Sequence, residues 1–222
     1  MNHTTDFGNN DDLTFFGKVN ASISHELKNS MAIISEAAGL LQDLTEMSVK
    51  GQKMEPEMLK SCSDDIIEEI QRSFTIIKQM NVFSHSVDDP VRTVNLLDLI
   101  NLMAALSKFL SFASKIRFDP IPEEGSVVLT CPFRLQNLIY QALIFAFKSV
   151  GPNGQIAVGL QPQPNGAAHI TFSDLGASNS RSFTTDKTKI LAASIGVDIR
   201  EDSSLQSFKL IVPENFKERQ QP

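Results

Sequence analysis

The feature that most constrains this chain is a long row of apolar residues spaced three or four positions apart. The row comprises Val19, Ile23, Leu27, Met31, Ile34, Ala38, Leu41 and Leu44. Because an α-helix has 3.6 residues per turn, this spacing places the whole row on one face of a single long helix. We expect that helix to begin near Asp11 or Asp12, which are good N-terminal capping residues, and to end around residues 47–51.

A second apolar row follows the turn-like segment GQKMEPEM. It comprises Leu59, Cys62, Ile66, Ile70, Phe74, Ile77 and Met80. Pro56 suits the first turn of the helix that carries this row. Two long helices joined by a short turn predict an antiparallel hairpin. A hairpin alone buries too little of such wide apolar faces, so we expect two copies to pair as a four-helix bundle.

The pattern changes after the polar segment SVDDPVRT (86–93), which we interpret as a linker. Helices are expected at 96–113, 132–150 and 184–195. Strands are expected in KIRFDP, SVVLTC, QIAVGLQPQ, AAHITFSD, VDIRED and SFKLIVP, with IPEEG as a turn between the first two. Helices segregated from largely antiparallel strands indicate a two-layer α/β sandwich. The sequence therefore predicts an α+β chain, with a helical hairpin over 11–87 and an α/β domain over 91–216.

Composition and charge exclude several classes of function. The 222-residue chain has a net charge of -6, which argues against a nucleic-acid-binding surface. Its two cysteines, Cys62 and Cys131, form no zinc-ligand cluster and suit a reducing compartment. The N-terminal segment lacks the features of a signal peptide, and no apolar run approaches the roughly 20 residues that span a bilayer. We expect a cytoplasmic protein with no bound metal and no direct membrane insertion.

The segment SISHELKNSMAII (22–34) carries the candidate reactive residues. On a helix, His25 lies about 200° from Ile23 and should therefore face water, and Asn29 follows one turn later on the same face. The carboxylate of Glu26 could accept one ring proton and leave the other ring nitrogen as a nucleophile. A phosphoryl group is the natural electrophile, because positioning supplies most of the catalysis of its transfer. The residues alone also allow a plain solvated surface.

This segment resembles the H-box of two-component sensor histidine kinases. The resemblance implies that His25 is the phospho-accepting histidine, that Glu26 is the acid that assists it, and that Asn29 occupies the position used in hydrolysis of the phosphorylated partner. Ser30 stands where that family usually has proline, so we expect a straighter helix here. The resemblance covers almost the whole chain, as a dimerisation hairpin followed by a domain of the histidine-kinase ATPase type.

The nucleotide site that the resemblance implies is incomplete. The two N-box asparagines are replaced by Gln141 and Phe145, and a phenyl ring offers Mg²⁺ no oxygen ligand. Of the Asp-x-Gly-x-Gly box, Asp174 and Gly176 remain as a degenerate cofactor-binding remnant, with Ser178 in place of the second glycine. The glycine-rich box is missing, and the segment before the next helix is too short for a long lid. We therefore expect no use of ATP and no cofactor.

Together these features predict a phosphorelay protein similar to the histidine phosphotransferases that lost ATP use. His25 would exchange a phosphoryl group with receiver aspartates of response regulators, and Lys28 and Asn29 would contact that group or the receiver's active site. The protein would act as a homodimer. Three alternatives stay open at this point: an ATP-dependent sensor kinase with a divergent nucleotide site, a non-catalytic dimeric scaffold, and a receiver phosphatase that uses Asn29.

Overall fold

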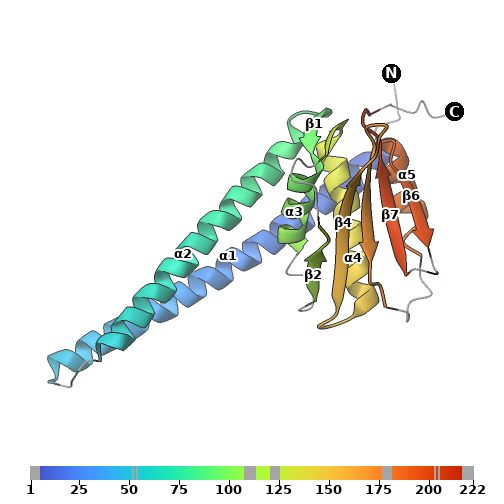
Figure 1. Ribbon diagram of the computed structural model, residues 1–222. Coiled ribbons are helices and arrows are strands. Elements are labelled where there is room, and N and C mark those ends of the chain that lie inside the picture. Colours follow the sequence, from blue (N-terminus) through green and yellow to red (C-terminus); the bar gives the residue numbers. More distant parts are fainter. Residues whose placement is uncertain are drawn as a thin grey trace. The chain divides into compact units, whose positions relative to one another are not determined.

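The computed structural model describes residues 6–51, 53, 55–107, 114–120, 126–176, 182–202, 204 and 206–216. The chain divides into two compact units (Figure 1). One is a helical unit, Phe16–Ser84. The other is an α/β unit, which consists of the start of the first helix, up to Phe15, and of the chain from His85 onward. The α+β class expected from the sequence is confirmed.

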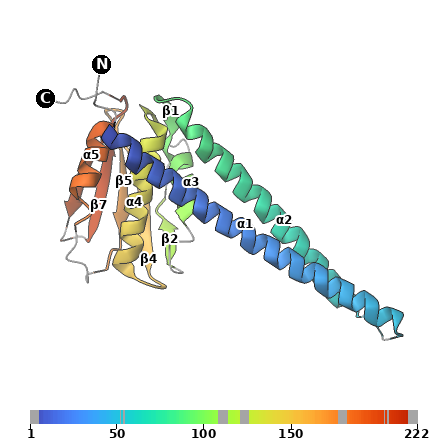
Figure 2. The same cartoon turned by 180° about the vertical axis from the view of Figure 1, so that it is seen from behind.

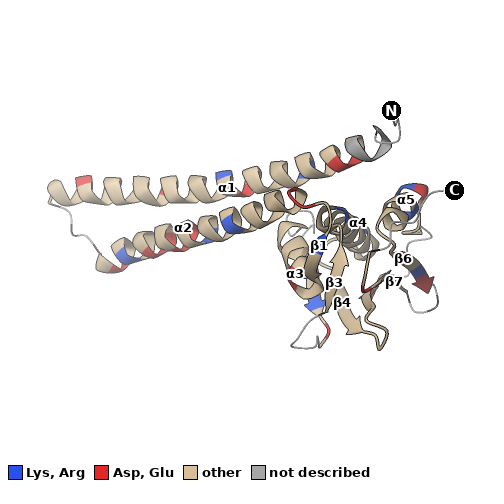
Figure 3. Cartoon of the chain, turned by 90° about the horizontal axis from the view of Figure 1, so that it is seen from above, with Lys and Arg blue, Asp and Glu red and all other residues tan. Residues whose placement is uncertain are grey.

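The helical unit is built from α1 (Asp6–Val49) and α2 (Pro56–Ser84), joined by a turn at Gly51. The α2 helix begins at Pro56, as the sequence predicts. Four acidic residues of α2, at 64, 65, 68 and 69, follow one another with no basic residue between them, and the basic residues lie before and after this run (Figure 3). At the open end of the hairpin, the rings of Phe16 and Phe83 stack with centroids 5.5 Å apart.

The buried faces of the two helices differ from the rows read in the sequence. On α1, the buried positions run through Val19, Ile23, Glu26, Ser30, Ala37 and Leu44. On α2, they run through Cys62, Ser73, Ile76 and Phe83. Met31, predicted to be buried, is 51% exposed, and Phe74 is 69% exposed. The middle of the hairpin is polar, so the two helices of one chain leave these positions exposed, and the expected pairing with a second copy stays a prediction.

The first turns of α1 belong to the α/β unit, and this explains why the helix begins at Asp6 rather than near Asp11 or Asp12. The two later aspartates do not act as N-terminal caps. Asp11 Oδ1 lies 3.1 Å from Lys187 Nζ, and Asp12 Oδ2 lies 3.6 Å from Arg134 Nε. Phe15 follows them on α1, with its ring 5.3 Å from that of Phe133 and 5.2 Å from that of Tyr140.

The α/β unit holds two sheets. The larger has the order β2 (Lys115–Phe118), β4 (Gln155–Pro162), β5 (Ala168–Ser173), β7 (Ser207–Val212) and β6 (Asp198–Asp202). Only its β2–β4 pair is parallel, so the sheet is largely antiparallel, as predicted. The smaller sheet pairs β1 (Arg92–Asn95) with β3 (Val127–Thr130).

Two features of this topology were not predicted. The β1 strand lies partly in the segment interpreted as a linker. The β2 and β3 strands belong to different sheets and do not pair with each other. The IPEEG turn expected between them, 121–125, lies outside the described residues. Strand pairing is decided by partners distant in the chain, which a local pattern does not reveal.

Helices α3 (Leu96–Ser107), α4 (Pro132–Val150) and α5 (Asp186–Ser194) complete the unit. Figures 1 and 2 show α4 and α5 on the same face of the larger sheet, and α4 packs against β4 and β5. The bounds of α4 match the prediction. The α3 helix was expected to reach residue 113, but 108–113 lie outside the described part. Thr185 caps α5 through a reciprocal pair of hydrogen bonds with Thr188.

Within the described ranges, no helix has both the length and the hydropathy that crossing a bilayer requires. In the same part of the chain, no group of three or more His, Cys, Asp or Glu side chains is arranged to hold a metal ion.

Candidate phosphoryl-acceptor site

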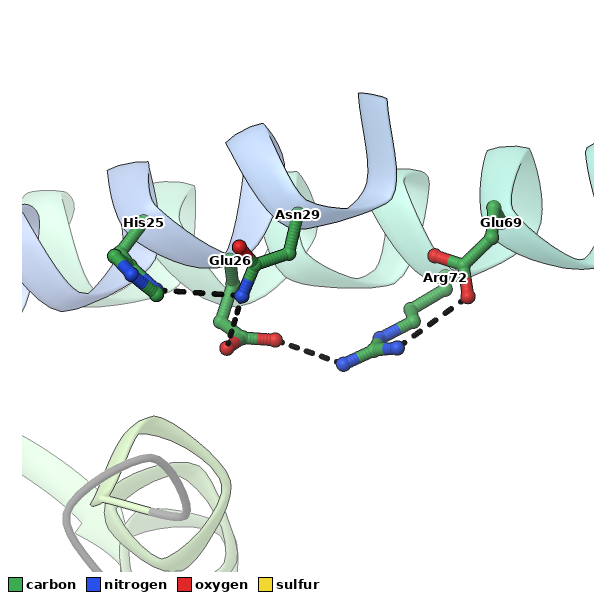
Figure 4. A network of polar contacts seen from close by, with 5 residues as sticks. All are labelled: His25, Glu26, Asn29, Glu69 and Arg72. Atoms are coloured by element: carbon green, nitrogen blue, oxygen red, sulfur yellow. Dashed lines mark hydrogen bonds and ion pairs between the residues drawn. The ribbon is translucent and has the colours of Figure 1, made fainter. Parts of the chain in front are cut away.

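His25 is exposed on α1, as the helical geometry predicts, and Asn29 lies one turn later (Figure 4). The Nδ2 atom of Asn29 lies 3.3 Å from His25 Nδ1 and donates to Glu26 Oε1 at 3.4 Å. A carboxylate can only accept a hydrogen bond, so the amide nitrogen, and not the amide oxygen, must face Glu26. The same nitrogen then donates to His25 Nδ1. In this geometry the neutral ring carries its proton on Nε2.

Glu26 does not form the direct hydrogen bond to His25 that the sequence suggested. Its carboxylate bonds Asn29 and Arg72 in the described structure, and the residue is 6% exposed. Neighbouring residues on a helix point 100° apart, so Glu26 faces the interior of the hairpin while His25 faces water. Glu26 therefore reaches the imidazole only through the side chain of Asn29.

Arg72 is the site residue that sequence reasoning missed. From α2, its Nη2 donates to Glu26 Oε2 at 2.8 Å and its Nη1 donates to Glu69 Oε1 at 3.3 Å. The signal that could have found it is the register of Glu26, which lies three residues after the buried Ile23 and four before the buried Ser30. A carboxylate at such a position requires a cation on the facing helix, and Arg72 is the only arginine of α2.

The remaining residues of the motif differ in their surroundings. Lys28 is exposed and makes no hydrogen bond or ion pair with any described residue. Ser30 is fully buried, and its Oγ has no hydrogen-bond partner in the described part of the chain, as is also true of Ser73 Oγ and Glu69 Oε2. The α1 helix continues unbroken past Ser30, consistent with the absence of proline at this position.

The two residues that the resemblance assigns to a nucleotide site, Asp174 and Gly176, both have close neighbours in the α/β unit. Asp174 Oδ2 accepts a hydrogen bond from Arg117 Nη2 at 3.0 Å, and Arg117 also donates to Asp119 Oδ1 at 2.6 Å. A Cβ atom added to Gly176 would lie 2.8 Å from the carbonyl oxygen of Ser149, so close packing against the end of α4 explains the glycine. Both residues therefore have close neighbours within the α/β unit itself.

Phe145, which the resemblance aligns with the second N-box asparagine, belongs to an aromatic cluster. Its ring centroid lies 5.6 Å from that of Phe183 and 5.7 Å from that of Phe208. Phe208 also stacks on Phe172 at 4.8 Å and on Phe183 at 4.5 Å. Aromatic pairs at such separations stabilise a core beyond the area that they bury. Gln141, at the first asparagine position, donates to Asn137 Oδ1 at 2.9 Å.

The short segment before α5 is fastened to β6 by Glu201. Its Oε1 accepts from Ser182 Oγ at 2.8 Å, from the backbone N–H of Thr184 at 2.6 Å, and from the hydroxyl of Thr184. Although partial burial alone would raise it, hydrogen bonds from Thr184 and Ser182 bring the pKa of Glu201 below its ordinary value. Ser182 and Thr184 are therefore held against β6.

We expect Glu201→Gln to destabilise the protein at neutral pH by less than about 1 kcal/mol, because the carboxylate is largely solvated. A lowered folded-state pKa means that this stabilisation is present above the unfolded pKa and is lost as pH falls through the folded value. Urea unfolding at several pH values checks this. The two proteins should differ at pH 7 and converge in acid, below the ordinary glutamate pKa of 4.5. A difference that widens in acid would contradict it.

A scan against protein-family models gave no match, and a search of curated protein sequences gave none either. Among solved structures, the chain is similar to the catalytic domain of histidine kinase ThkA, with 16% identity over 57% of this chain and 99% of that one, at a TM-score of 0.46. The mycobacterial sensor histidine kinase MprB is 15% identical over 57% of this chain and 99% of that one, at a TM-score of 0.47. Histidine kinase AdeS of Acinetobacter baumannii is 10% identical over 86% of this chain and 98% of that one, at a TM-score of 0.46. Similarity of this degree assigns no function, which must be inferred from the site itself.

Proposed function

We propose that this protein is a histidine phosphotransfer protein of a two-component phosphorelay. His25 accepts a phosphoryl group from the aspartate of one response-regulator receiver domain and donates it to another, without using ATP. The observation that carries the proposal is the exposed imidazole on an unbroken helix, oriented by the amide of Asn29, with Glu26 beside it. The resemblance of SISHELKNSMAII to an H-box supports the same role. The cytoplasmic setting expected from the sequence is part of this proposal.

The transfer is a direct displacement at phosphorus. A ring nitrogen of His25 forms the new N–P bond with its lone pair, while the bond between phosphorus and the receiver's aspartyl oxygen breaks. The aspartate leaves as a carboxylate with the bonding electrons. The proton on the other ring nitrogen stays on the ring, where it can be donated in a hydrogen bond to a neighbouring acceptor. Donation to a second receiver reverses these steps. Any Mg²⁺ that the step requires is supplied by the receiver.

The α/β unit supports the part of the proposal that excludes ATP. Asp174, which the resemblance assigns to adenine recognition, is bonded to Arg117. Phe145 contributes a packed ring where a metal-binding amide would be needed. We propose that this unit serves as a docking surface or a brace for the dimer. Calorimetric titration with ATP and Mg²⁺ tests whether the protein binds nucleotide. No heat is expected, and micromolar binding would instead favour the ATP-dependent kinase with a divergent site.

Exposed apolar residues on the hairpin support the homodimer. Ile67, Ile70, Phe74 and Ile77 are all more than two-fifths exposed, and their spacing of three or four residues places them on one face of α2. Met31 on α1 is also exposed. A contiguous apolar face of this kind marks an interaction site in a soluble chain. We propose that a second copy covers it and completes a four-helix bundle.

A further inference from the structure

One guanidinium is shared by two carboxylates in the polar middle of the hairpin (Figure 4). Arg72 Nη2 donates to Glu26 Oε2 at 2.8 Å, and Nη1 donates to Glu69 Oε1 at 3.3 Å. A guanidinium can instead bind one carboxylate through two parallel hydrogen bonds, which is the stronger arrangement. Arg72 thus gives one hydrogen bond to Glu26 and one to Glu69. Loss of the bond to Glu69 is expected to strengthen the bond to Glu26.

The side chains that hydrogen-bond the imidazole decide which ring nitrogen of His25 is protonated. While Arg72 holds Glu26 in the hairpin, the only side chain that hydrogen-bonds the ring in the described structure is Asn29, which donates to Nδ1. The proton then resides on Nε2, the nitrogen left free for a partner, and a protonated nitrogen has no lone pair for attack. If the carboxylate of Glu26 turned to the ring, it would accept a hydrogen bond from a protonated Nδ1. Nε2 would then be left with its lone pair.

We propose that Arg72 is a positioning residue that sets the tautomer of His25 by holding or releasing Glu26. When it releases Glu26, one proton leaves Nε2 for water and another binds Nδ1, so the charge of the ring does not change. The side chain of Arg72 is 47% exposed, so the phosphoryl anion of an approaching receiver can compete with Glu26 for the guanidinium. The partner's own charge would in this way switch His25 into its nucleophilic form. The role of this switch in phosphoryl transfer rests on the proposed function. The tautomer of His25, in contrast, can be measured in the protein alone.

The test is ¹⁵N NMR of the imidazole nitrogens of His25 in the full chain. Arg72→Met should shift the tautomer ratio toward the Nδ1-protonated form by about tenfold, the effect of losing one charge-assisted hydrogen bond. Glu69→Gln should shift the ratio in the opposite direction, toward the Nε2-protonated form. Arg72 then loses the carboxylate of Glu69 and holds Glu26 more firmly. Glu68→Gln, at an exposed neighbouring position, is the matched control and should change nothing.

A purely structural role for Arg72 predicts a different pattern. It would leave the tautomer ratio unchanged in all variants, or shift it in the same direction in Arg72→Met and Glu69→Gln, since both disturb one buried layer. Either result overturns the proposal. If Arg72→Met does not fold, Arg72→Lys replaces it. A lysine is a single point charge that cannot fork between two carboxylates, so an intermediate ratio is expected.

Failure of this inference can be distinguished from failure of the proposed function. Opposite tautomer shifts in a protein that takes no phosphoryl group from any receiver would support the role of Arg72 and contradict the phosphorelay role. Transfer through His25 with an unresponsive tautomer ratio would do the reverse.

Discussion

Replacing His25 with glutamine is expected to abolish phosphoryl transfer from a phosphorylated receiver, lowering its rate by at least about a thousandfold. Glutamine keeps a polar side chain at an exposed helical position but offers no ring nitrogen for the N–P bond. The side chain is exposed, so the fold and the unfolding midpoint should change little. Loss of ³²P from the receiver into the protein, followed over time, measures the effect.

His85 provides the matched control for this substitution. It is a histidine with a side chain 72% exposed, and its Nδ1 lies 2.6 Å from Asp88 Oδ2. His85→Gln is expected to transfer at the wild-type rate. If His25→Gln still accepted the label, or if both variants lost it equally, His25 would not be the acceptor and the account of the site would be wrong.

Replacing Phe74 with aspartate is expected to convert the proposed homodimer into a monomer, weakening association by about a hundredfold or more. Phe74 is the most exposed large apolar residue of α2, at 69%. In the dimer its ring would be covered by the second copy, and a carboxylate at that position would have to lose its hydration without a partner. Sedimentation equilibrium at micromolar concentrations measures the change in the dissociation constant.

Thr75→Asp is the control for the dimer, since it adds the same charge at an exposed position of the same helix, about 120° away from the centre of the apolar face. That variant should remain dimeric. A wild-type protein that sediments as a monomer, or a Phe74→Asp variant that remains a dimer, would show that the exposed row has another partner.

Much of the fold could be predicted because its signals are local. The α4 helix matches its expected bounds because Pro132 fits its first turn and Gly151, with a φ of 72°, ends it. The β1 strand was missed because its four residues pair with β3, about 35 residues later, and only that pairing makes them a strand. The turn between β2 and β3 suggested that the two strands pair, yet β2 pairs with β4.

The candidate site shows the same division between local and distant information. The shared face of His25 and Asn29 follows from the 100° turn per residue, and the structure brings the two side chains together. The inward direction of Glu26 follows from the same geometry, but the cation that pairs with it does not. Glu26 can be buried because Arg72, 46 residues later in the chain, neutralises it. Similarly, the engagement of Asp174 depends on Arg117, 57 residues earlier in the chain.

The central claim is that His25 receives its phosphoryl group from a receiver and not from ATP. The most direct measurement gives the purified protein ³²P-labelled phosphoreceiver in one reaction and γ-³²P-ATP with Mg²⁺ in another, and locates the label by peptide mapping. The account predicts acid-labile label on His25 from the receiver and none from ATP. Label on His25 from ATP alone, or no label from any phosphorylated receiver, would contradict it.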